Sequence, residues 1–132
     1  MVERGIWLCL VHGTTVQRPL PADDLLEFIR LPSYERSSRG LFGEDEHQLV
    51  ESMLVTDPDA GAVIAGTGGV RKLRVALPGG GKSGGARVIY YFRQRKARIY
   101  LILAYAKRAR ENITKAERNA MRKVTAGLEE ER

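Results

Sequence analysis

Residues 70–92, VRKLRVALPGGGKSGGARVIYYF, decide the fold because they place two strand-like segments around a glycine-rich loop. Residues 70–77 alternate between apolar and polar side chains, so one face carries Leu73, Val75 and Leu77 and the other Lys72, Arg74 and Ala76. Residues 86–92 are rich in the β-branched and aromatic side chains that strands favour. The residues between them have the composition of a turn. The sequence therefore predicts a β-hairpin with one basic face.

Two further segments extend this hairpin into a sheet. Residues 98–105, RIYLILAY, are almost continuously apolar, which predicts a central strand that is covered on both faces. Residues 25–30 predict another strand, which Pro32 ends. The segment 33–39 fits either one short helical turn or an irregular link.

Helices are predicted on both sides of the hairpin in the sequence. Residues 44–56 have three acidic residues in the first turn, a stripe formed by Leu49, Val50, Met53 and Leu54, and Pro58 just beyond the end. Thr114 and Glu117 have the spacing of a capping box, which predicts a C-terminal helix. Its expected apolar stripe consists of Ala116, Ala120, Met121, Val124 and Leu128.

These elements predict an α+β protein with a mostly antiparallel sheet of about four strands flanked by helices. A chain of 132 residues with 43% hydrophobic residues fits a single domain. We expect residues 1–22 to form a poorly ordered leader, residues 23–128 the domain, and residues 129–132 a tail. The single cysteine, Cys9, excludes an internal disulfide, and no apolar run is long enough for a membrane span. A cytoplasmic protein with no membrane partner is therefore expected.

Positive charge is concentrated in one part of the chain. Residues 71–123 contain 16 of the 22 Lys and Arg residues but only two of the 16 acidic residues, Glu111 and Glu117. This local excess of 14 positive charges is typical of a protein that binds a polyanion, most often nucleic acid. The same excess would also suit an acidic protein partner, or protect a sheet edge from pairing.

Residues 76–83, ALPGGGKS, approach the pattern of a phosphate-binding loop. That motif needs a helix to begin at its Lys-Ser pair, so that the helix amides hold the phosphates. The residues that follow, Gly84 and Gly85 and then 86–92, predict a strand instead. A nucleotide triphosphatase is therefore disfavoured, and residues 78–85 are interpreted as a hairpin loop.

Histidine and carboxylate chemistry is weakly supported. His12 lies in the expected leader and His47 near the start of a helix on its polar side, so neither suits a general acid or base. The acidic residues of 23–24 and 44–46 are interpreted as a solvated segment and a helix first turn. No metal ion or other cofactor is expected.

Three segments in order resemble a known family. Residues 66–75, GTGGVRKLRV, then 81–92, GKSGGARVIYYF, and then 105–107, YAK, resemble the HigB-type branch of the RelE superfamily of toxins from bacterial toxin–antitoxin pairs. The resemblance covers roughly residues 26–128. It implies a compact sheet with flanking helices, and a ribosome-dependent mRNA endonuclease that a cognate antitoxin, expected to be a helix-turn-helix protein, silences.

The resemblance also implies a mechanism and roles for individual residues. In such enzymes the RNA 2′-hydroxyl attacks the adjacent phosphate without a metal ion, and positive charge stabilises the transition state. Lys72 and Arg74 match the paired basic residues of the family's strand, one of them as candidate base, and Arg87 matches the arginine that holds the phosphate. The further residues expected to bind RNA phosphates are Arg71, Lys82, Lys107 and Arg108.

The chain departs from some relatives at one position. Where they have a catalytic tyrosine after the last basic pair, this chain has Glu111, Asn112, Ile113 and Thr114, so the resemblance assigns no general acid. We expect Tyr90, Tyr91, Tyr100 and Tyr105 to be sheet or core residues. Two alternatives stay open: a non-catalytic nucleic-acid-binding module, and a degenerate toxin that acts only as a protein-interaction partner.

Overall fold

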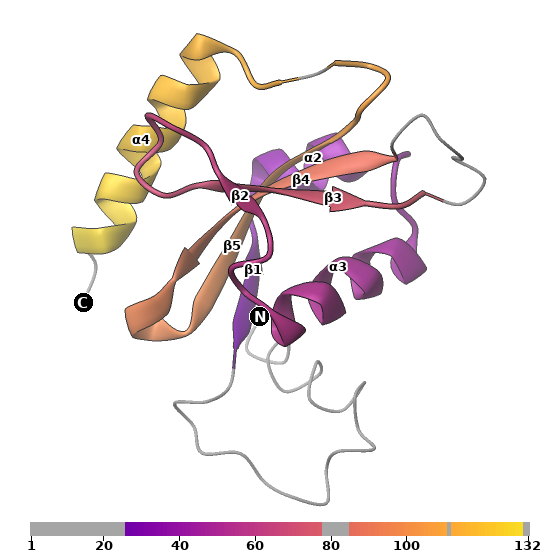
Figure 1. Cartoon of the computed structure of the whole chain (residues 1–132), viewed down its shortest axis with the longest axis horizontal. Helices are drawn as coiled ribbons and strands as arrows, with labels where there is room; N and C mark the ends of the chain where they lie inside the picture. The colour runs from indigo at the N-terminus through magenta and orange to yellow at the C-terminus, as the bar shows by residue number, and fades with distance from the viewer. Residues whose placement is uncertain (1–25, 78–84, 111, 131–132) are drawn as a thin grey trace, which may run out of the picture.

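A computed structural model describes residues 26–77, 85–110 and 112–130, which form a five-stranded sheet with three α-helices (Figure 1). The elements in chain order are β1 (Glu27–Arg30), α2 (Pro32–Ser38), α3 (Glu44–Thr56), β2 (Ala62–Val63), β3 (Arg71–Val75), β4 (Ala86–Arg93), the 3-10 turn η4 (Gln94–Lys96), β5 (Arg98–Ala106) and α4 (Lys115–Glu130). The architecture confirms the predicted α+β class, with one strand more than the four expected.

The strand order β1-β5-β4-β3-β2 places the predicted hairpin and the apolar strand β5 in the middle of the sheet. Neighbouring strands are antiparallel except for β1, which runs parallel to β5. The register of β4 against β5 shifts between Ile89, opposite Leu103, and Tyr90, opposite Leu101. The extra residue, Ile102, forms a bulge. On either side of the bulge, opposed residues of β4 and β5 still share a face of the sheet.

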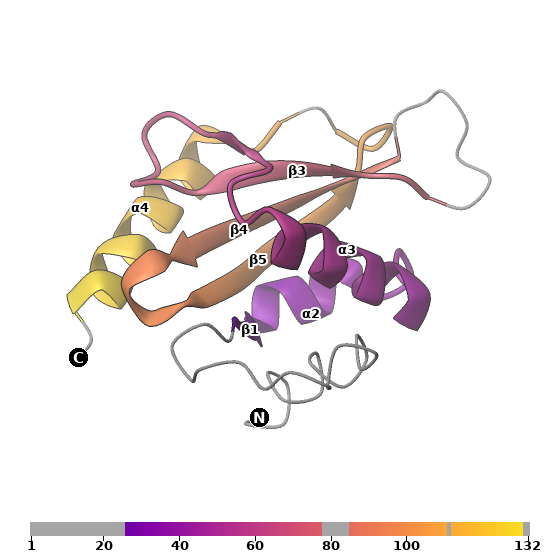
Figure 2. The ribbon, with the colours of Figure 1, turned by 60° about the horizontal axis from the view of Figure 1, so that its bottom comes forward.

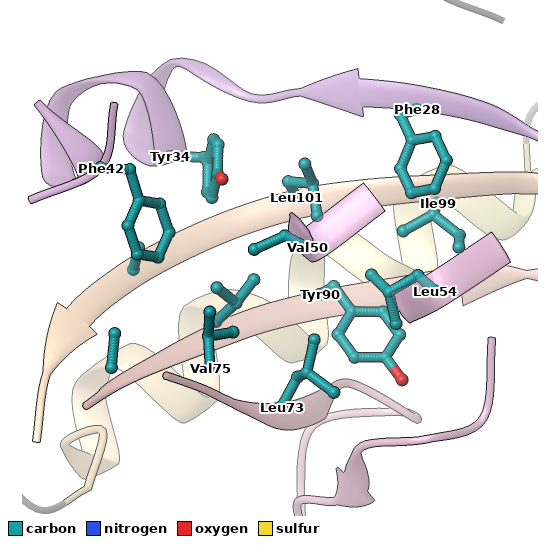
Figure 3. Close-up of a cluster of buried hydrophobic side chains, with 13 residues drawn as sticks. Phe28, Tyr34, Phe42, Val50, Leu54, Leu73, Val75, Tyr90, Ile99 and Leu101 are labelled. Carbon is teal, nitrogen blue, oxygen red and sulfur yellow. The ribbon is translucent and has the colours of Figure 1, made fainter. Parts of the chain in front are cut away.

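One face of the sheet is covered by α2 and α3, and we call it the α2/α3 face (Figure 2). Leu73, Val75 and Tyr90 point from the strands into a cluster that also contains Val50 and Leu54 from α3 (Figure 3). Ile99 and Leu101 of β5 belong to the same cluster (Figure 3). The buried residues that complete the cluster are Phe28, Tyr34, Phe42, Ala86, Val88 and Ala104.

The opposite face, which we call the α4 face, packs against the C-terminal helix. Met121 of α4 lies in a second cluster with residues of β4, of β5 and of the segment before the helix. Thr125 is buried in the helix and donates a hydrogen bond to the Thr67 carbonyl at 3.0 Å. Gly68, at a positive φ of 80°, permits this close approach, because a Cβ there would collide with the Thr125 hydroxyl.

Most element boundaries agree with the sequence prediction. The helix expected over 44–56 is α3, and the two halves of the expected hairpin are β3 and β4. Residues 33–39, left open between a helical turn and a link, lie mostly in the seven-residue helix α2, whose first residue is Pro32. The short strand β2 lies between α3 and the hairpin, where the sequence pattern predicts no strand.

The predicted apolar stripe of α4 is only partly correct. The capping box is present: Glu117 N–H donates to Thr114 Oγ1 at 3.0 Å, and Thr114 N–H donates to Glu117 Oε1 at 2.8 Å. However, Ala116, Ala120 and Val124 are exposed, and the buried positions are Met121 and Thr125. The polar contact of Thr125 fixes the rotation of the helix, since two alanines bury too little area to compete.

At the ends of the chain, α4 continues through Glu130, so residues 129 and 130 lie in the helix rather than in the expected tail. The expected leader, residues 1–22, lies outside the described residues. Within the described ranges, no helix combines the length and apolar character needed to cross a membrane.

Candidate functional site

A row of side chains crosses the three central strands on the α4 face. Arg74 of β3 lies opposite Arg87 of β4, and Arg87 lies opposite Tyr105 of β5. Directly opposed residues in a sheet have their Cβ atoms about 5 Å apart. The guanidinium groups of Arg74 and Arg87 therefore start from opposed backbone positions. Their positive charges repel each other unless an anion or other partners offset the repulsion.

Lys72 belongs to the next row on the same face, opposite Ile89. Its ammonium group donates a hydrogen bond to Asn112 Oδ1 at 3.1 Å. Asn112 lies in the segment 111–114, where some relatives of the resembled family have a catalytic tyrosine. The contact shows that this segment reaches the cationic residues of β3, although Glu111 itself lies outside the described residues.

Two more of the predicted phosphate-binding residues follow β5. The Lys107 amide donates to the Gly85 carbonyl at 2.9 Å, which continues the β4–β5 pairing to the start of β4. Lys107 is partly exposed and Arg108 is exposed. Both therefore lie at the end of the sheet that carries Arg74 and Arg87. We call Lys72, Arg74, Arg87, Lys107 and Arg108 the cationic end of the α4 face.

The members of this set differ in exposure. Arg74 is exposed and Lys72 partly so, whereas Arg87 is only 5% exposed and its Nη1 donates to the Ala86 carbonyl at 3.1 Å. A buried guanidinium acts through a medium of lower effective dielectric constant than water. In this structure Arg87 is thus less accessible to a bound phosphate than Arg74 or Lys72.

Arg110 is a residue that the sequence prediction omitted. Its guanidinium carbon lies 4.6 Å from the centre of the Tyr105 ring, and its Nη1 forms an ion pair with Glu117 Oε1 at 2.9 Å. Burial raises the pKa of Glu117, but the hydrogen bonds from Arg110 and from Thr114 outweigh it, and the pKa is lowered overall. The sequence gives one sign of this ion pair: a basic residue before the start of the helix is followed, seven positions later, by an acidic residue in its first turn.

Arg71 is not brought together with the other cations. It lies opposite Tyr90, whose ring is buried on the α2/α3 face. Its Nη1 donates to the carbonyls of Asp59 at 3.1 Å and Gly61 at 2.7 Å, and its Nη2 lies 3.3 Å from Asp59 Oδ1. Because successive strand residues point to opposite faces, Arg71 holds the 59–61 turn instead of joining Lys72 and Arg74.

The hairpin loop contains another predicted phosphate-binding residue, Lys82, which lies outside the described residues, as does most of the near-match to a phosphate-binding loop. Beyond the loop, the chain enters β4, antiparallel to β3. The helix that a phosphate-binding loop requires does not follow, which confirms the interpretation as a hairpin.

His47 lies far from the cationic set in the architecture, on α3 at the α2/α3 face. Its Nδ1 is 2.9 Å from the hydroxyl of the buried Tyr34, and its ring makes an edge contact with Phe42. Burial and then the positive charge of Arg30 lower the pKa of His47. His12 lies outside the described residues.

The four tyrosines of β4 and β5 are buried, as the sequence predicts: Tyr90, Tyr91, Tyr100 and Tyr105. Burial, followed by a hydrogen bond to Glu129, raises the pKa of Tyr91 to about 12. Within residues 26–77, 85–110 and 112–130, no three His, Cys, Asp or Glu side chains gather in an arrangement that could hold a metal ion.

Comparison with known proteins assigns the chain to a family. Two solved structures of the E. coli toxin RelE resemble the chain. A double arginine-to-alanine mutant in the free state has 16% identity, a TM-score of 0.46 and matched regions of 64% of this chain and 85% of RelE. The isolated toxin has 15% identity, a TM-score of 0.45 and matched regions of 74% and 96%. A family model described as the RelE toxin of the RelE/RelB toxin–antitoxin system matches residues 44–131, two thirds of the chain. The chain therefore belongs to the RelE toxin family.

Proposed function

We propose that this toxin is an endoribonuclease that cleaves mRNA on the ribosome at the cationic end of the α4 face. The observation that carries the proposal is the row formed by Arg74 and Arg87, with Lys72 in the next row of the same face. A set of fixed positive charges on a rigid sheet suits a reaction whose transition state gains negative charge on a phosphate.

In the proposed reaction, the RNA 2′-hydroxyl loses its proton and its oxygen attacks the adjacent phosphorus. The bond to the 5′-oxygen of the next nucleotide breaks, which leaves a 2′,3′-cyclic phosphate and, after protonation, a 5′-hydroxyl. Lys72 is the proposed base, because a lysine can accept a proton in its neutral form and an arginine does not deprotonate in proteins.

The other cations are proposed to bind phosphates or to stabilise their negative charge. Exposed Arg74 is proposed to contact the phosphate oxygens directly, and buried Arg87 to raise the positive potential beneath them. Lys107 and Arg108, at the end of β5, are proposed to bind neighbouring backbone phosphates. Lys82 of the loop is proposed for the same role, on the basis of its sequence position alone.

Membership of a toxin–antitoxin family implies an antitoxin partner. We propose that this antitoxin is a helix-turn-helix protein. The non-catalytic alternative, in which the same cations only neutralise phosphates, makes a different prediction: salt-sensitive RNA binding without cleaved product.

A translating extract tests the proposal. Addition of the purified protein should produce new RNA 5′-hydroxyl ends within translated messages, detected by 5′-end labelling with a polynucleotide kinase. Arg74→Ala should lose this activity about 100- to 1000-fold, as expected for one transition-state donor. Arg95→Ala, at an exposed arginine of η4 beyond the other end of β4, is the matched control and should cleave as wild type. An absence of new ends with wild-type protein would refute the enzymatic function.

A further inference from the structure

Three basic residues of α4 lie on one side of the helix: Lys115, Arg118 and Arg122. Their spacing of three and four residues keeps them on the same face, and the set extends about 10 Å along the helix axis. Lys115 and Arg122 are exposed and Arg118 is partly exposed. We call these residues the α4 basic stripe.

The stripe is unfavourable for the helix itself. Like charges four residues apart, as at Arg118 and Arg122, repel each other. Cations near the first turn also oppose the helix dipole, and α4 has Glu129 and Glu130 rather than basic residues in its last turn. The stripe cations and the two terminal glutamates thus oppose the helix dipole, whereas Glu117 in the first turn favours it.

Five of the described arginines outside the stripe form ion pairs within the fold. Arg30, Arg71, Arg93, Arg98 and Arg110 each lie within salt-bridge distance of a carboxylate. Among the described residues, by contrast, none of the three stripe residues has a carboxylate partner. Arg122 Nη1 donates to the Gly66 carbonyl at 3.2 Å, and this partner carries no negative charge. Within the described part of the chain, no carboxylate neutralises the stripe.

The stripe begins beside the cationic end of the α4 face. Asn112, which accepts a hydrogen bond from Lys72, precedes Lys115 by three residues. The first turn of α4 is tied to Arg110 through Glu117. From there the stripe leads along the helix to the contact of Arg122 with Gly66, so a polyanion bound at the sheet can continue along α4.

We propose that Lys115, Arg118 and Arg122 bind backbone phosphates of RNA outside the linkage that is cleaved. The inference rests on the proposed function, since it takes RNA as the ligand of the sheet. RNA is favoured over an acidic protein segment because three cations in line, without apolar side chains between them, suit a repeating phosphate backbone. The phosphates can belong to the message or to ribosomal RNA, and two measurements distinguish these sources.

The first measurement uses a short single-stranded RNA made uncleavable by 2′-O-methylation. Its affinity is measured by fluorescence anisotropy over a range of salt concentrations. The triple variant Lys115→Gln/Arg118→Gln/Arg122→Gln should reduce the slope of log affinity against log salt by about 2, because each phosphate contact on a single strand contributes about 0.7. The control variant Arg36→Gln/Arg95→Gln/Lys96→Gln removes three exposed cations elsewhere and should keep the wild-type slope.

The second measurement is cosedimentation with ribosomes that carry no message. A loss of affinity for the oligonucleotide assigns the stripe to the message strand, and a loss confined to the ribosomes assigns it to ribosomal RNA; either result supports the proposal. If the triple variant matches the control in both measurements, the proposal is overturned. A loss of antitoxin affinity alone would overturn it in favour of an acidic protein segment.

The variants also separate this inference from the enzymatic proposal. Glutamine favours helices, and the triple variant removes repulsion, so it should unfold at the same temperature as wild type or at a higher one. If wild type binds RNA in a stripe-dependent way but cleaves none, the endonuclease proposal fails and the stripe stands. If Arg74→Ala abolishes cleavage while the triple variant binds the oligonucleotide and the ribosomes as the control does, only the proposal for the stripe fails.

Discussion

On the α2/α3 face of the sheet, apolar side chains continue from β1 to β3 beneath two helices, whereas on the α4 face they give way to Arg74, Arg87 and Lys72. Both faces are built from the same strands, and the alternation of side chains separates them residue by residue. Arg71 and Lys72 illustrate this: one holds a turn on the first face, and the other contacts Asn112 on the second. The comparison indicates that one face stabilises the fold and the other presents charge, and the following variants test that division.

The largest loss of stability is expected on the α2/α3 face. Leu101 is 1% exposed in the interior strand β5, between Arg30 and Tyr90 of the neighbouring strands. Leu101→Ala should lower the free energy of unfolding by about 2–5 kcal/mol, through lost burial and a residual cavity. Urea denaturation measures the change. Leu49→Ala is the matched control, since Leu49 is 40% exposed on α3, and should change stability by no more than about 0.5 kcal/mol.

A substitution of Lys72 on the α4 face should instead lower activity and leave stability nearly unchanged. Lys72→Arg keeps the positive charge but removes the proposed base, so it should lower the cleavage rate about 100-fold or more. Stability in urea should stay within about 0.5 kcal/mol of wild type, because the side chain is partly exposed. Lys96→Arg provides the control for the same exchange at an exposed site. If Lys72→Arg cleaves at the wild-type rate, Lys72 contributes charge alone.

Glu117 lies where α4 adjoins the cationic end, and its loss should affect both properties moderately. Glu117→Ala removes the acceptor of the Thr114 amide and the partner of Arg110, and should cost about 1 kcal/mol of stability. Since the pKa of Glu117 is below its ordinary 4.5 in the folded protein, its contribution is complete at neutral pH and declines as the pH falls below that value.

Urea denaturation at neutral pH and at about pH 3 measures this contribution. The difference between wild type and Glu117→Ala should shrink at the acidic pH. Glu129→Ala, near the other end of the same helix, is a poor control because Tyr91 donates a hydrogen bond to Glu129. Glu130→Ala is the better choice, since Glu130 is exposed. An equal difference at both pH values would show that Glu117 acts through something other than its charge.

The smallest effect, on the pH dependence of stability, is expected from a substitution of His47 on α3. Its lowered pKa means that folding disfavours the protonated ring, so its contribution is complete above pH 6.5 and is lost as the pH falls below that value. The groups around it include Arg30, which opposes protonation, and Glu44, which favours it. His47→Gln should flatten the fall in melting temperature between about pH 7 and 5. A fall as steep as in wild type would exclude His47 as its source.

Local patterns predicted most elements because each pattern arises from residues close in the sequence. The acidic first turn and Pro58 delimit α3, and the Thr114–Glu117 box marks the start of α4. The alternation in 71–75 predicted which side chains of β3 are buried. The short strand β2 was missed because two residues show no period, and its pairing depends on β3 being present.

The candidate site is predicted only in part from the sequence. The sequence by itself determined the excess of positive charge, the strands that carry it and the pairing of Lys72 with Arg74 on one face, since these follow from composition and from the period of a strand. Only the tertiary structure decided that Arg71 holds a turn, that Arg87 is buried opposite Arg74, and that Arg110 lies over Tyr105. The physical reason is that exposure, partners and register depend on strands and helices that are distant in the chain and meet only in the folded sheet.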